Sequence, residues 1–322
     1  MRVYGPVPSR RFGLSLGIDV IPMKSCTFDC IYCQLGASGR RVGERRLFYP
    51  VDDILTDVKK ALNTGPRPDV LTLAGSGEPT LYTGLDAVID GLRDLADIPI
   101  LLITNSSLLW MDEVADAVKK VDIIAPSLDA GDETKYRRIN RPLPEFSFEK
   151  MFDGLKRVTD DHPGEIHLEV MLIDGINDDE ESLQAIARRL AQLRFHRIDI
   201  NTPVRPPMPE RGAMPCSTEV LARAQALFGE NAFPIAAFVD RPRHPEKRKS
   251  RRFSDRDKDI RELLLRRPSS AGDIAASLVI PRADVDSSLR ALLAAGVVEA
   301  RQRGDKVFFH VIGDNPGLTT KT

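Results

Sequence analysis

The stretch IPMKSCTFDCIYCQLG, residues 21–36, contains three of the four cysteines in this 322-residue chain, Cys26, Cys30 and Cys33. Their spacing is C-x3-C-x2-C, and the aromatic Tyr32 comes directly before the last thiol. Four thiolates complete a cuboidal iron–sulfur cluster, so a loop that offers three leaves one iron with a free coordination position. An open position can bind a reactant, as it does in catalytic zinc sites. The stretch therefore predicts a reactive metal centre.

Two other interpretations of these thiols stay open at this point. A structural zinc site or cluster could be completed by Cys216 or by one of the five histidines, although structural zinc loops favour paired C-x2-C ligands. The cysteines could also be unpaired core residues. A disulfide framework is disfavoured, because three thiols crowd into one loop while Cys216 lies far along the chain.

The residues on both sides of the loop predict an α/β fold. Strands are expected at residues 16–22, 69–78, 98–107, 121–130, 165–177 and 197–204. Amphipathic helical patterns separate several of them, at residues 51–63, 84–96, 111–121 and 179–193. Parallel strands return through right-handed crossovers, so six such units curl into a partial (β/α)6 barrel of the TIM type. We expect this barrel domain to cover residues 1–235, with functional loops at the carboxyl ends of its strands.

The last part of the chain has a different pattern. Residues 236–253 are rich in proline and basic residues and are predicted to form a linker. Residues 254–312 carry three helical patterns and a predicted β-hairpin around Gly304, an order that indicates a small winged helix-turn-helix domain. We expect this domain to fold by itself, so that its removal leaves the metal centre and its reaction with the cofactor intact while turnover of the final substrate falls. Residues 313–322 are expected to be a flexible tail.

The composition of the chain limits its expected partners and cellular location. Hydrophobic residues make up 42% of the chain, charged residues 29%, and the formal net charge is -1, so global charge does not point to nucleic acid. No run of 18 apolar residues occurs, and the opening residues lack the pattern of a signal peptide. We therefore expect a cytoplasmic protein without a membrane span.

The segment CTFDCIYC, directly after the first predicted strand, is similar to the signature of the radical SAM superfamily. In that family three thiolates hold a four-iron, four-sulfur (4Fe-4S) cluster, and the remaining iron binds the amino and carboxylate groups of S-adenosylmethionine (SAM). One electron then cleaves SAM and yields a 5′-deoxyadenosyl radical, which abstracts hydrogen from a substrate. The resemblance covers roughly residues 10–210 and implies an enzyme whose cofactors carry the difficult chemistry.

Polar residues at the predicted strand ends extend this resemblance. The stretch LAGSGEPTLY, residues 73–82, is similar to the Gly-Gly-Glu segment with which the family binds the methionyl amino group, and Glu78 would supply the complementary charge. An ordinary strand–helix turn and helix caps are the alternative interpretation of such residues. The metal ligands implied are Cys26, Cys30 and Cys33. The cofactor-binding residues implied are Tyr32, Ser76, Gly77, Glu78, Asn105, Ser127, Asp129 and Asn177.

The final substrate is less clearly indicated. Stretches such as SGEPTL and INTPVRPP resemble the branch that includes wyosine-type tRNA-modifying enzymes, which favours a tRNA or other RNA base. Those enzymes carry a second cysteine triad ahead of the radical SAM motif, whereas no cysteine precedes Cys26 here. A peptide or a metabolite is the alternative substrate, with the winged helix docking a protein. An electron donor such as flavodoxin or ferredoxin is implied. A second class of function is a redox-sensing regulator whose winged helix binds DNA.

Overall fold

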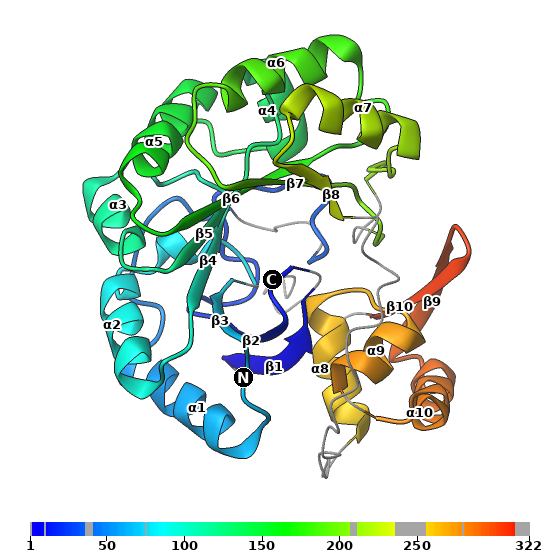
Figure 1. Ribbon diagram of the computed structural model, residues 1–322. Helices are drawn as coiled ribbons and strands as arrows, with labels where there is room; N and C mark the ends of the chain where they lie inside the picture. The colour runs from blue at the N-terminus through cyan, green and yellow to red at the C-terminus, as the bar shows by residue number, and fades with distance from the viewer. Residues whose placement is uncertain are drawn as a thin grey trace, which may run out of the picture.

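The computed structural model describes residues 2–9, 11–35, 41–74, 76–206, 211–235, 256–278 and 280–312. Within these ranges an eight-stranded sheet runs in the order β1 to β8 and curves into a partial barrel (Figure 1). β1 (Val3–Pro8) pairs antiparallel with β2 (Leu14–Ile18), and every later neighbour pair is parallel. The parallel strands that follow are β3 (Val70–Leu73), β4 (Ile100–Thr104), β5 (Ile123–Pro126), β6 (Glu165–Met171), β7 (Arg197–Asn201) and β8 (Ala232–Pro234).

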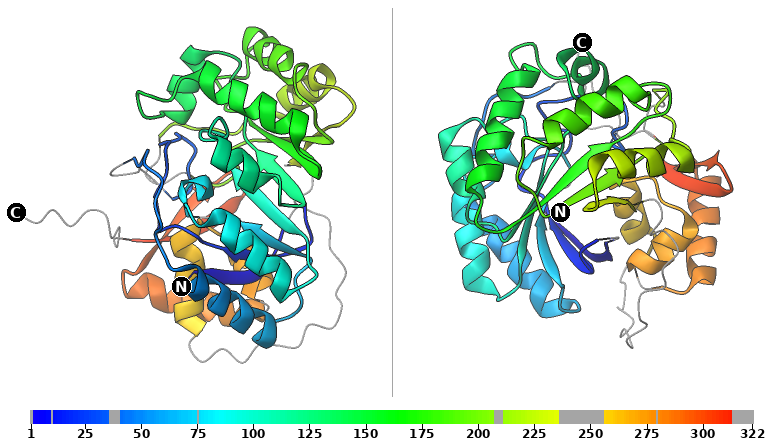
Figure 2. Two further views of the ribbon diagram at one scale, coloured as in Figure 1. Left: turned by 90° about the vertical axis from the view of Figure 1, so that its left-hand side faces the viewer. Right: turned by 45° about the horizontal axis from the view of Figure 1, so that its top comes forward.

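Helices cover the outer face of this sheet, as the two further views show (Figure 2). They are α1 (Val51–Thr64), α2 (Leu85–Leu95), α3 (Asp112–Val118), α4 (Glu133–Asn140), α5 (Phe148–Asp161), α6 (Glu180–Leu190) and α7 (Thr218–Phe228), with a 3-10 helix, η1 (Pro79–Leu81), after β3. In α2 the residues Leu85, Val88, Ile89 and Leu92 are fully buried, because their spacing places them on one helix face. They join the main hydrophobic core between helices and strands.

The predicted fold class is confirmed, but the sheet is larger than expected. The sequence patterns predict six strands, whereas the described residues contribute eight to this sheet. β1 was missed because its sequence VYGPVP mixes glycine and prolines with apolar residues, and such residues normally mark turns. β8 was missed because it is only three residues long. α4 and α5 also lie unpredicted between β5 and β6.

The C-terminal unit, residues 256–278 and 280–312, has the predicted order of three helices and a hairpin. Its elements are α8 (Arg256–Arg266), α9 (Ala271–Leu278), α10 (Arg282–Ala294), β9 (Val298–Arg303) and β10 (Lys306–Val311). They enclose a separate hydrophobic cluster around Ile260, Ile274 and Val285. The unit lies beside β1, which α9 contacts, at the open edge of the sheet (Figure 1). The predicted linker and tail lie outside the described residues.

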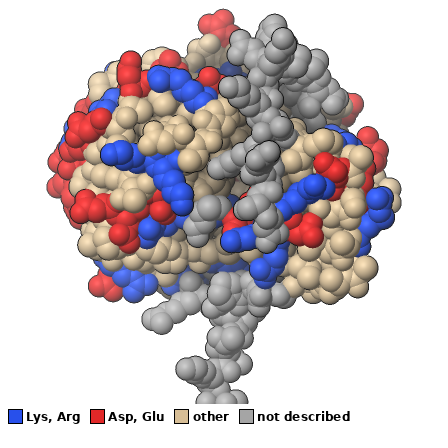
Figure 3. Space-filling model, turned by 90° about the horizontal axis from the view of Figure 1, so that it is seen from below, with Lys and Arg blue, Asp and Glu red and all other residues tan. Residues whose placement is uncertain are grey.

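Two further features of the described residues concern the expected lack of a membrane span and the distribution of surface charge. None of the helices in the described ranges combines the length and the apolar composition that a membrane crossing requires. Seen from below, basic and acidic side chains are interspersed over the described part of the molecule (Figure 3). That face therefore presents no extended field of one sign.

Candidate functional site

The candidate site lies where neighbouring parallel strands end. The cysteine loop, residues 23–35, follows β2 and Asp19, and the Ser76–Glu78 turn follows β3. Asn105 comes directly after β4, and Asp129 comes shortly after β5. Parallel strands that pair in sequence order have their carboxyl ends on one edge of the sheet. The fold therefore brings the predicted residues together.

The three loop cysteines are free thiols, and amide groups lie against two of them. The Asn105 side-chain amide is 3.4 Å from the Cys26 sulfur, and the Asn140 amide is 3.6 Å from the Cys30 sulfur. Burial raises the pKa of Cys26 to about 12, and it also raises the pKa values of Cys30 and Cys33. A buried thiol of this kind stays neutral by itself and loses its proton when it binds a metal. Neighbouring N–H donors then stabilise the charged sulfur.

The number of thiols on the loop fits a cluster better than a single structural metal ion. A structural zinc needs four ligands at one centre, whereas the loop offers three thiols, each of which a cluster would take on a different iron. Cys216 is buried, and its backbone N–H donates to Thr202 Oγ1 at 2.8 Å. The donor set on the loop therefore fits a 4Fe-4S cluster.

The Ser76–Glu78 turn forms one wall of the cysteine loop. The Lys24 N–H donates to the Ser76 carbonyl at 2.5 Å, and the Glu78 N–H donates to the Ser25 carbonyl at 2.9 Å. A Cβ atom on Gly77 would lie 1.9 Å from the Ser25 carbonyl oxygen. Glycine is needed here because the loop backbone occupies the space of a side chain. The family resemblance implies that Gly77 lies against the cofactor, and the structure shows that its close neighbour within the protein is the cysteine loop.

The carboxyl end of α4 forms the other wall, which sequence patterns did not predict. The Asp29 N–H donates to the Asn140 carbonyl at 3.0 Å, and the Ile31 N–H donates to the Ile139 carbonyl at 2.9 Å. These bonds place the Asn140 amide beside Cys30. Asn140 ends an unpredicted helix, and only the tertiary contact marks it as a site residue.

The Glu78 carboxylate is 1% exposed and accepts hydrogen bonds from the protein itself. Its Oε1 accepts from the Thr80 N–H at 3.1 Å, from Thr80 Oγ1 at 2.5 Å and from Thr104 Oγ1 at 2.7 Å, and its Oε2 accepts from the Asn105 N–H at 2.7 Å. Burial raises the pKa of Glu78, and these donors oppose the rise. The carboxylate thus ties the end of β3 to the end of β4. Oε2, with one donor, is the oxygen that retains acceptor capacity.

Asp129 organises the next part of the site. Its Oδ2 accepts from the Tyr32 hydroxyl at 2.5 Å and from the Asn140 amide at 2.7 Å, and its Oδ1 accepts from the Met171 N–H at 3.0 Å. Burial raises the pKa of Asp129, and burial together with this carboxylate raises the pKa of Tyr32 well above its ordinary value. The carboxylate therefore fixes the aromatic residue between the last two cysteines to the ends of β5 and β6.

Asn177 is fully buried and has a supporting position. Its amide N–H groups donate to the carbonyls of Asp129 and Met171, both at 2.9 Å, and its Oδ1 accepts from the Ile173 N–H at 2.7 Å. Both donors are used inside the protein. Asn177 is thus placed to hold the backbone of the segment after β6, and a direct cofactor contact by its amide N–H groups would need these bonds to open.

Ser76 and Ser127 are tied to neighbouring strand ends. The Ser76 N–H and hydroxyl both donate to the Asp19 carboxylate, at 3.0 and 2.9 Å. The Ser127 N–H donates to the Thr104 carbonyl at 3.0 Å, and its carbonyl accepts from the Ser106 hydroxyl at 2.9 Å. Asp19 was not predicted as a site residue, although it is an acidic residue at the end of a strand, where the other candidates were found.

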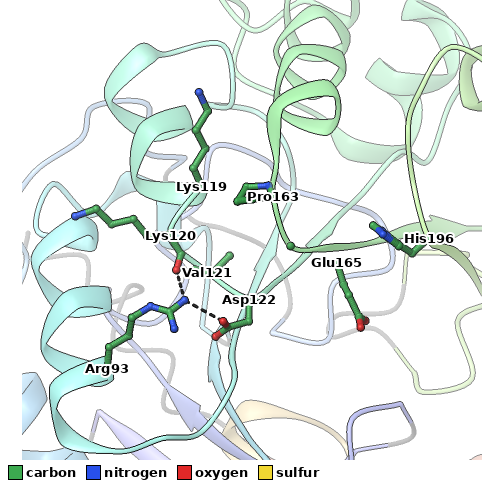
Figure 4. Close-up of a pocket in the computed structure, with 9 residues that line it drawn as sticks. Arg93, Lys119, Lys120, Val121, Asp122, Pro163, Glu165 and His196 are labelled. Carbon is green, nitrogen blue, oxygen red and sulfur yellow. Dashed lines mark hydrogen bonds and ion pairs between the residues drawn. The ribbon is translucent and has the colours of Figure 1, made fainter.

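A pocket of about 430 Å³ lies at the opposite end of the sheet, where β5 and β6 begin (Figure 4). The residues that line it are Arg93, Lys119, Lys120, Val121, Asp122, Pro163, Gly164, Glu165 and His196. Arg93 pairs with Asp122 at 3.0 Å, and Lys120 pairs with Asp86 at 2.6 Å. Because these charges already have partners, the pocket does not compete with the cysteine loop as the candidate site.

Comparison with the sequence models of known protein families identifies the family of this chain. Residues 20–187 match the sequence model of the radical SAM superfamily, a stretch that contains the cysteine loop and the ends of β3, β4 and β5. The chain belongs to the radical SAM superfamily. It is an enzyme, and its cofactors are the 4Fe-4S cluster and SAM that this superfamily uses. The wyosine-type branch stays a prediction.

Two relatives are similar to this radical SAM chain over most of its length. A protein from Brachyspira hyodysenteriae named GTPase Obg is 36% identical over 297 residues, which are 92% of this chain and 43% of that protein. A UPF0026 protein from Methanocaldococcus jannaschii is 39% identical over 229 residues, which are 70% of this chain and 71% of that protein. The radical SAM chain thus spans less than half the length of the first relative, whose GTPase name belongs to that longer protein.

A solved structure shares the fold. The radical SAM methyltransferase from Sphaerobacter thermophilus aligns with a TM-score of 0.52 at 18% identity, over 68% of this chain and 66% of that chain. At this identity the likeness concerns the fold.

Proposed function

We propose that Cys26, Cys30 and Cys33 hold the 4Fe-4S cluster and that SAM binds against the surrounding strand ends, so that the enzyme abstracts hydrogen from a further substrate. When bound, the cluster supplies one electron that cleaves SAM to methionine and a 5′-deoxyadenosyl radical. The observation that carries the proposal is the pair of backbone hydrogen bonds between the cysteine loop and the Ser76–Glu78 turn. They join the cluster ligands directly to the segment that resembles the SAM-binding turn of the family.

The residues around the loop have defined tasks in this proposal. The amides of Asn105 and Asn140 donate toward the Cys26 and Cys30 sulfurs and stabilise their ionised form. Glu78 holds the ends of β3 and β4 together, and its Oε2 can accept one further hydrogen bond from the ammonium group of SAM. Asp129 fixes Tyr32 beside the last ligand. These contacts preorganise the site before any ligand binds.

Anaerobic reconstitution tests the proposal. We expect about four irons and four sulfides per chain. Reduction by dithionite, or by flavodoxin or ferredoxin, which we propose as electron donors, should convert SAM to methionine and 5′-deoxyadenosine even without a substrate. Chromatography of the products measures the rate. A cluster-loaded, reduced protein that yields no 5′-deoxyadenosine with any donor would redirect the function to a redox-sensing regulator.

For the final substrate we propose an RNA base, with a tRNA base first. Three features support this: the resemblance to the wyosine-type branch, the winged-helix order of elements in the C-terminal unit, and the basic run in the predicted linker. That run lies outside the described residues and comprises Arg241, Arg243, Lys247, Arg248, Lys249, Arg251 and Arg252. Basic residues that track a phosphate backbone make binding weaken steeply with salt.

Binding of bulk tRNA at several salt concentrations tests the substrate class. We expect the affinity to fall as salt rises, and replacement of Lys247, Arg248, Lys249, Arg251 and Arg252 by glutamine to flatten that slope. Absence of binding, or binding that ignores salt, would move the substrate to a peptide or a metabolite and the winged helix to protein docking.

A further inference from the structure

The last turn of α8 brings an arginine of the C-terminal unit to the edge of the barrel site. Arg266 Nε lies 3.5 Å from Asp19 Oδ2, and its guanidinium stacks 4.9 Å from the centre of the Tyr4 ring on β1. Arg266 Nη1 also donates to the Glu262 carbonyl of its own helix at 3.1 Å. The side chain is 14% exposed. Its orientation is therefore fixed by the helix on one side and by the ring on the other.

Asp19 connects this arginine to the proposed SAM-binding turn. It is 5% exposed, and both of its oxygens accept hydrogen bonds from Ser76. Burial raises the pKa of Asp19, while the charge of Arg266 and the Ser76 donors oppose the rise. A buried carboxylate is stable only with such partners. The contact with Arg266 therefore helps to keep Asp19 ionised and Ser76 in place.

Ser76 in turn holds the start of the cysteine loop. Its carbonyl accepts the Lys24 N–H at 2.5 Å, two residues ahead of Cys26. A continuous path of contacts thus runs from Arg266 through Asp19 and Ser76 to the cluster-binding loop.

A second path reaches the same loop from the hairpin of the C-terminal unit. Arg303, the last residue of β9, donates to the carbonyls of Arg205 and Ala213, at 3.2 and 2.5 Å. Arg211, in the same segment after β7, pairs with the Asp29 carboxylate at 2.8 Å and donates to the Asp29 carbonyl at 3.1 Å. Asp29 lies between Cys26 and Cys30. Ala213, which Arg303 contacts, is thus two residues from Arg211, which contacts the middle of the cysteine loop.

We propose that Arg266 and Arg303 are positioning residues through which the C-terminal unit holds both flanks of the cysteine loop in the geometry that binds the cluster and SAM. This inference rests on the proposed function of the loop and adds a task for the C-terminal unit. The unit bridges the two sides of the open barrel, from the end of β2 to the segment after β7. Coupling between two sites is reciprocal, so SAM binding in the barrel also stabilises α8.

The test compares Arg266→Gln and Arg303→Gln in the full chain with Arg282→Gln as a matched control. Arg282 belongs to the same unit, but it lies on the surface of α10, 61% exposed, and pairs with Asp286 of its own helix. In the reconstituted enzyme we expect each of the first two variants to raise the KM for SAM about tenfold, the size of one lost charge-assisted contact. The control should keep the wild-type KM.

A double-variant cycle tests whether Arg266 acts on SAM binding through Asp19. If Arg266 acts through Asp19, then Arg266→Gln combined with Asp19→Asn should weaken SAM binding no more than the stronger single variant. Additive effects would overturn the path through Asp19. A loss of thermal stability with an unchanged KM for SAM would show a merely structural role and overturn the proposal.

A measurement that does not depend on enzyme activity can test this inference separately from the proposed function. In the cluster-free full chain, hydrogen exchange of residues 23–35 and alkylation of the three loop thiols should be about fivefold faster in both arginine variants, but not in the control, because the loop opens more often. If the wild type makes no 5′-deoxyadenosine, the proposed function fails while this measurement still decides the positioning role. An unchanged loop in both variants would overturn the inference.

Discussion

Cys26, Cys30 and Cys33 lie within one short loop, whereas the arginines that we propose to hold that loop come from positions 266 and 303 near the other end of the chain. These proposed ligands are close in sequence, as expected if one loop presents them together to the cluster. The supporting contacts need no such closeness: Arg266 and Asp19 are 247 residues apart, and Arg303 and Ala213 are 90 apart. Ligand sets can thus be recognised locally, while the parts that position them cannot.

The difference changes what is expected of the C-terminal unit. Sequence patterns alone predict a domain that folds by itself and can be removed without harm to the cluster. The unit does have its own hydrophobic cluster. Its contacts with Asp19 and Ala213, however, lead us to expect that its removal weakens SAM binding. Self-sufficient packing and functional independence are separate properties.

The largest expected effect tests whether the cysteine loop alone supplies the cluster ligands. Each of Cys26→Ala, Cys30→Ala and Cys33→Ala should abolish cluster binding and SAM cleavage, because each thiolate would hold a different iron of the cluster. Cys216→Ala is the matched control and should keep both. Iron analysis and Mössbauer spectra measure the outcome. Cluster loss in the control alone would contradict the three-ligand site.

The next effect concerns the internal role of Glu78. Glu78→Ala should lower the free energy of unfolding by on the order of 3 kcal/mol, because it leaves several buried donors without an acceptor. It should also weaken SAM binding. Glu113→Ala, at a 58% exposed carboxylate paired with Arg45, serves as control and should change stability little. Urea unfolding and SAM titration provide the measurements. Full stability of Glu78→Ala would show that the observed hydrogen bonds contribute little.

A smaller effect tests the wall between the turn and the loop. In Gly77→Ala the new methyl group would meet the Ser25 carbonyl, so we expect a loss of roughly 1–3 kcal/mol and a lower iron content. Gly272→Ala in α9 is the control, because its Cβ would have no neighbour closer than 3.8 Å. A helical Gly→Ala change at that open position should be neutral or slightly stabilising. Equal behaviour of the two variants would refute the packing explanation for Gly77.

The smallest expected effect is a loss of stability at low pH that is confined to the barrel and absent from the C-terminal unit. His162 is fully buried, and neither ring nitrogen has a hydrogen-bond partner among the described residues. Burial lowers the pKa of His162 from 6.5 to about 4. The folded barrel keeps this ring neutral while the unfolded chain takes up a proton, so stability is lost as pH falls below 6.5 toward 4. Between pH 7.5 and 5.5 the loss should be about 1 kcal/mol.

The variant His162→Phe should remove that pH dependence, as measured by hydrogen exchange of barrel amides at several pH values. Amides of the C-terminal unit serve as the internal control. There burial lowers the pKa of His310 while its contact with Glu299 opposes the fall, and a change at His162 should leave the pH profile of these amides as it is. An unchanged pH profile in His162→Phe would assign the acid sensitivity of the barrel to other groups.

The residues of the candidate site fall into the same two groups: those that the local sequence predicts and those that only tertiary contacts reveal. The sequence predicts Glu78, Asn105 and Asp129 because each is a polar residue at the end of a recognisable strand in a stretch that resembles the radical SAM family. It does not predict Asn140, which ends a helix with a mean hydropathy too low to resemble a core element. It does not predict that Ser25 packs against Gly77, a contact that only the folded chain shows. Position along a strand is a local property, but the neighbour of a side chain is not.

The sequence by itself determined the α/β class, the cysteine loop with its three proposed ligands, and the order of helices and hairpin at the C-terminus, because periodicity and cysteine spacing are properties of short segments. Tertiary structure alone decided which donors satisfy Glu78 and Asp129, which backbone walls enclose the cysteine loop, and that Arg266 reaches Asp19. Those contacts join residues that are distant along the chain. They form only when burial makes an unpaired polar group costly and the fold supplies its partner.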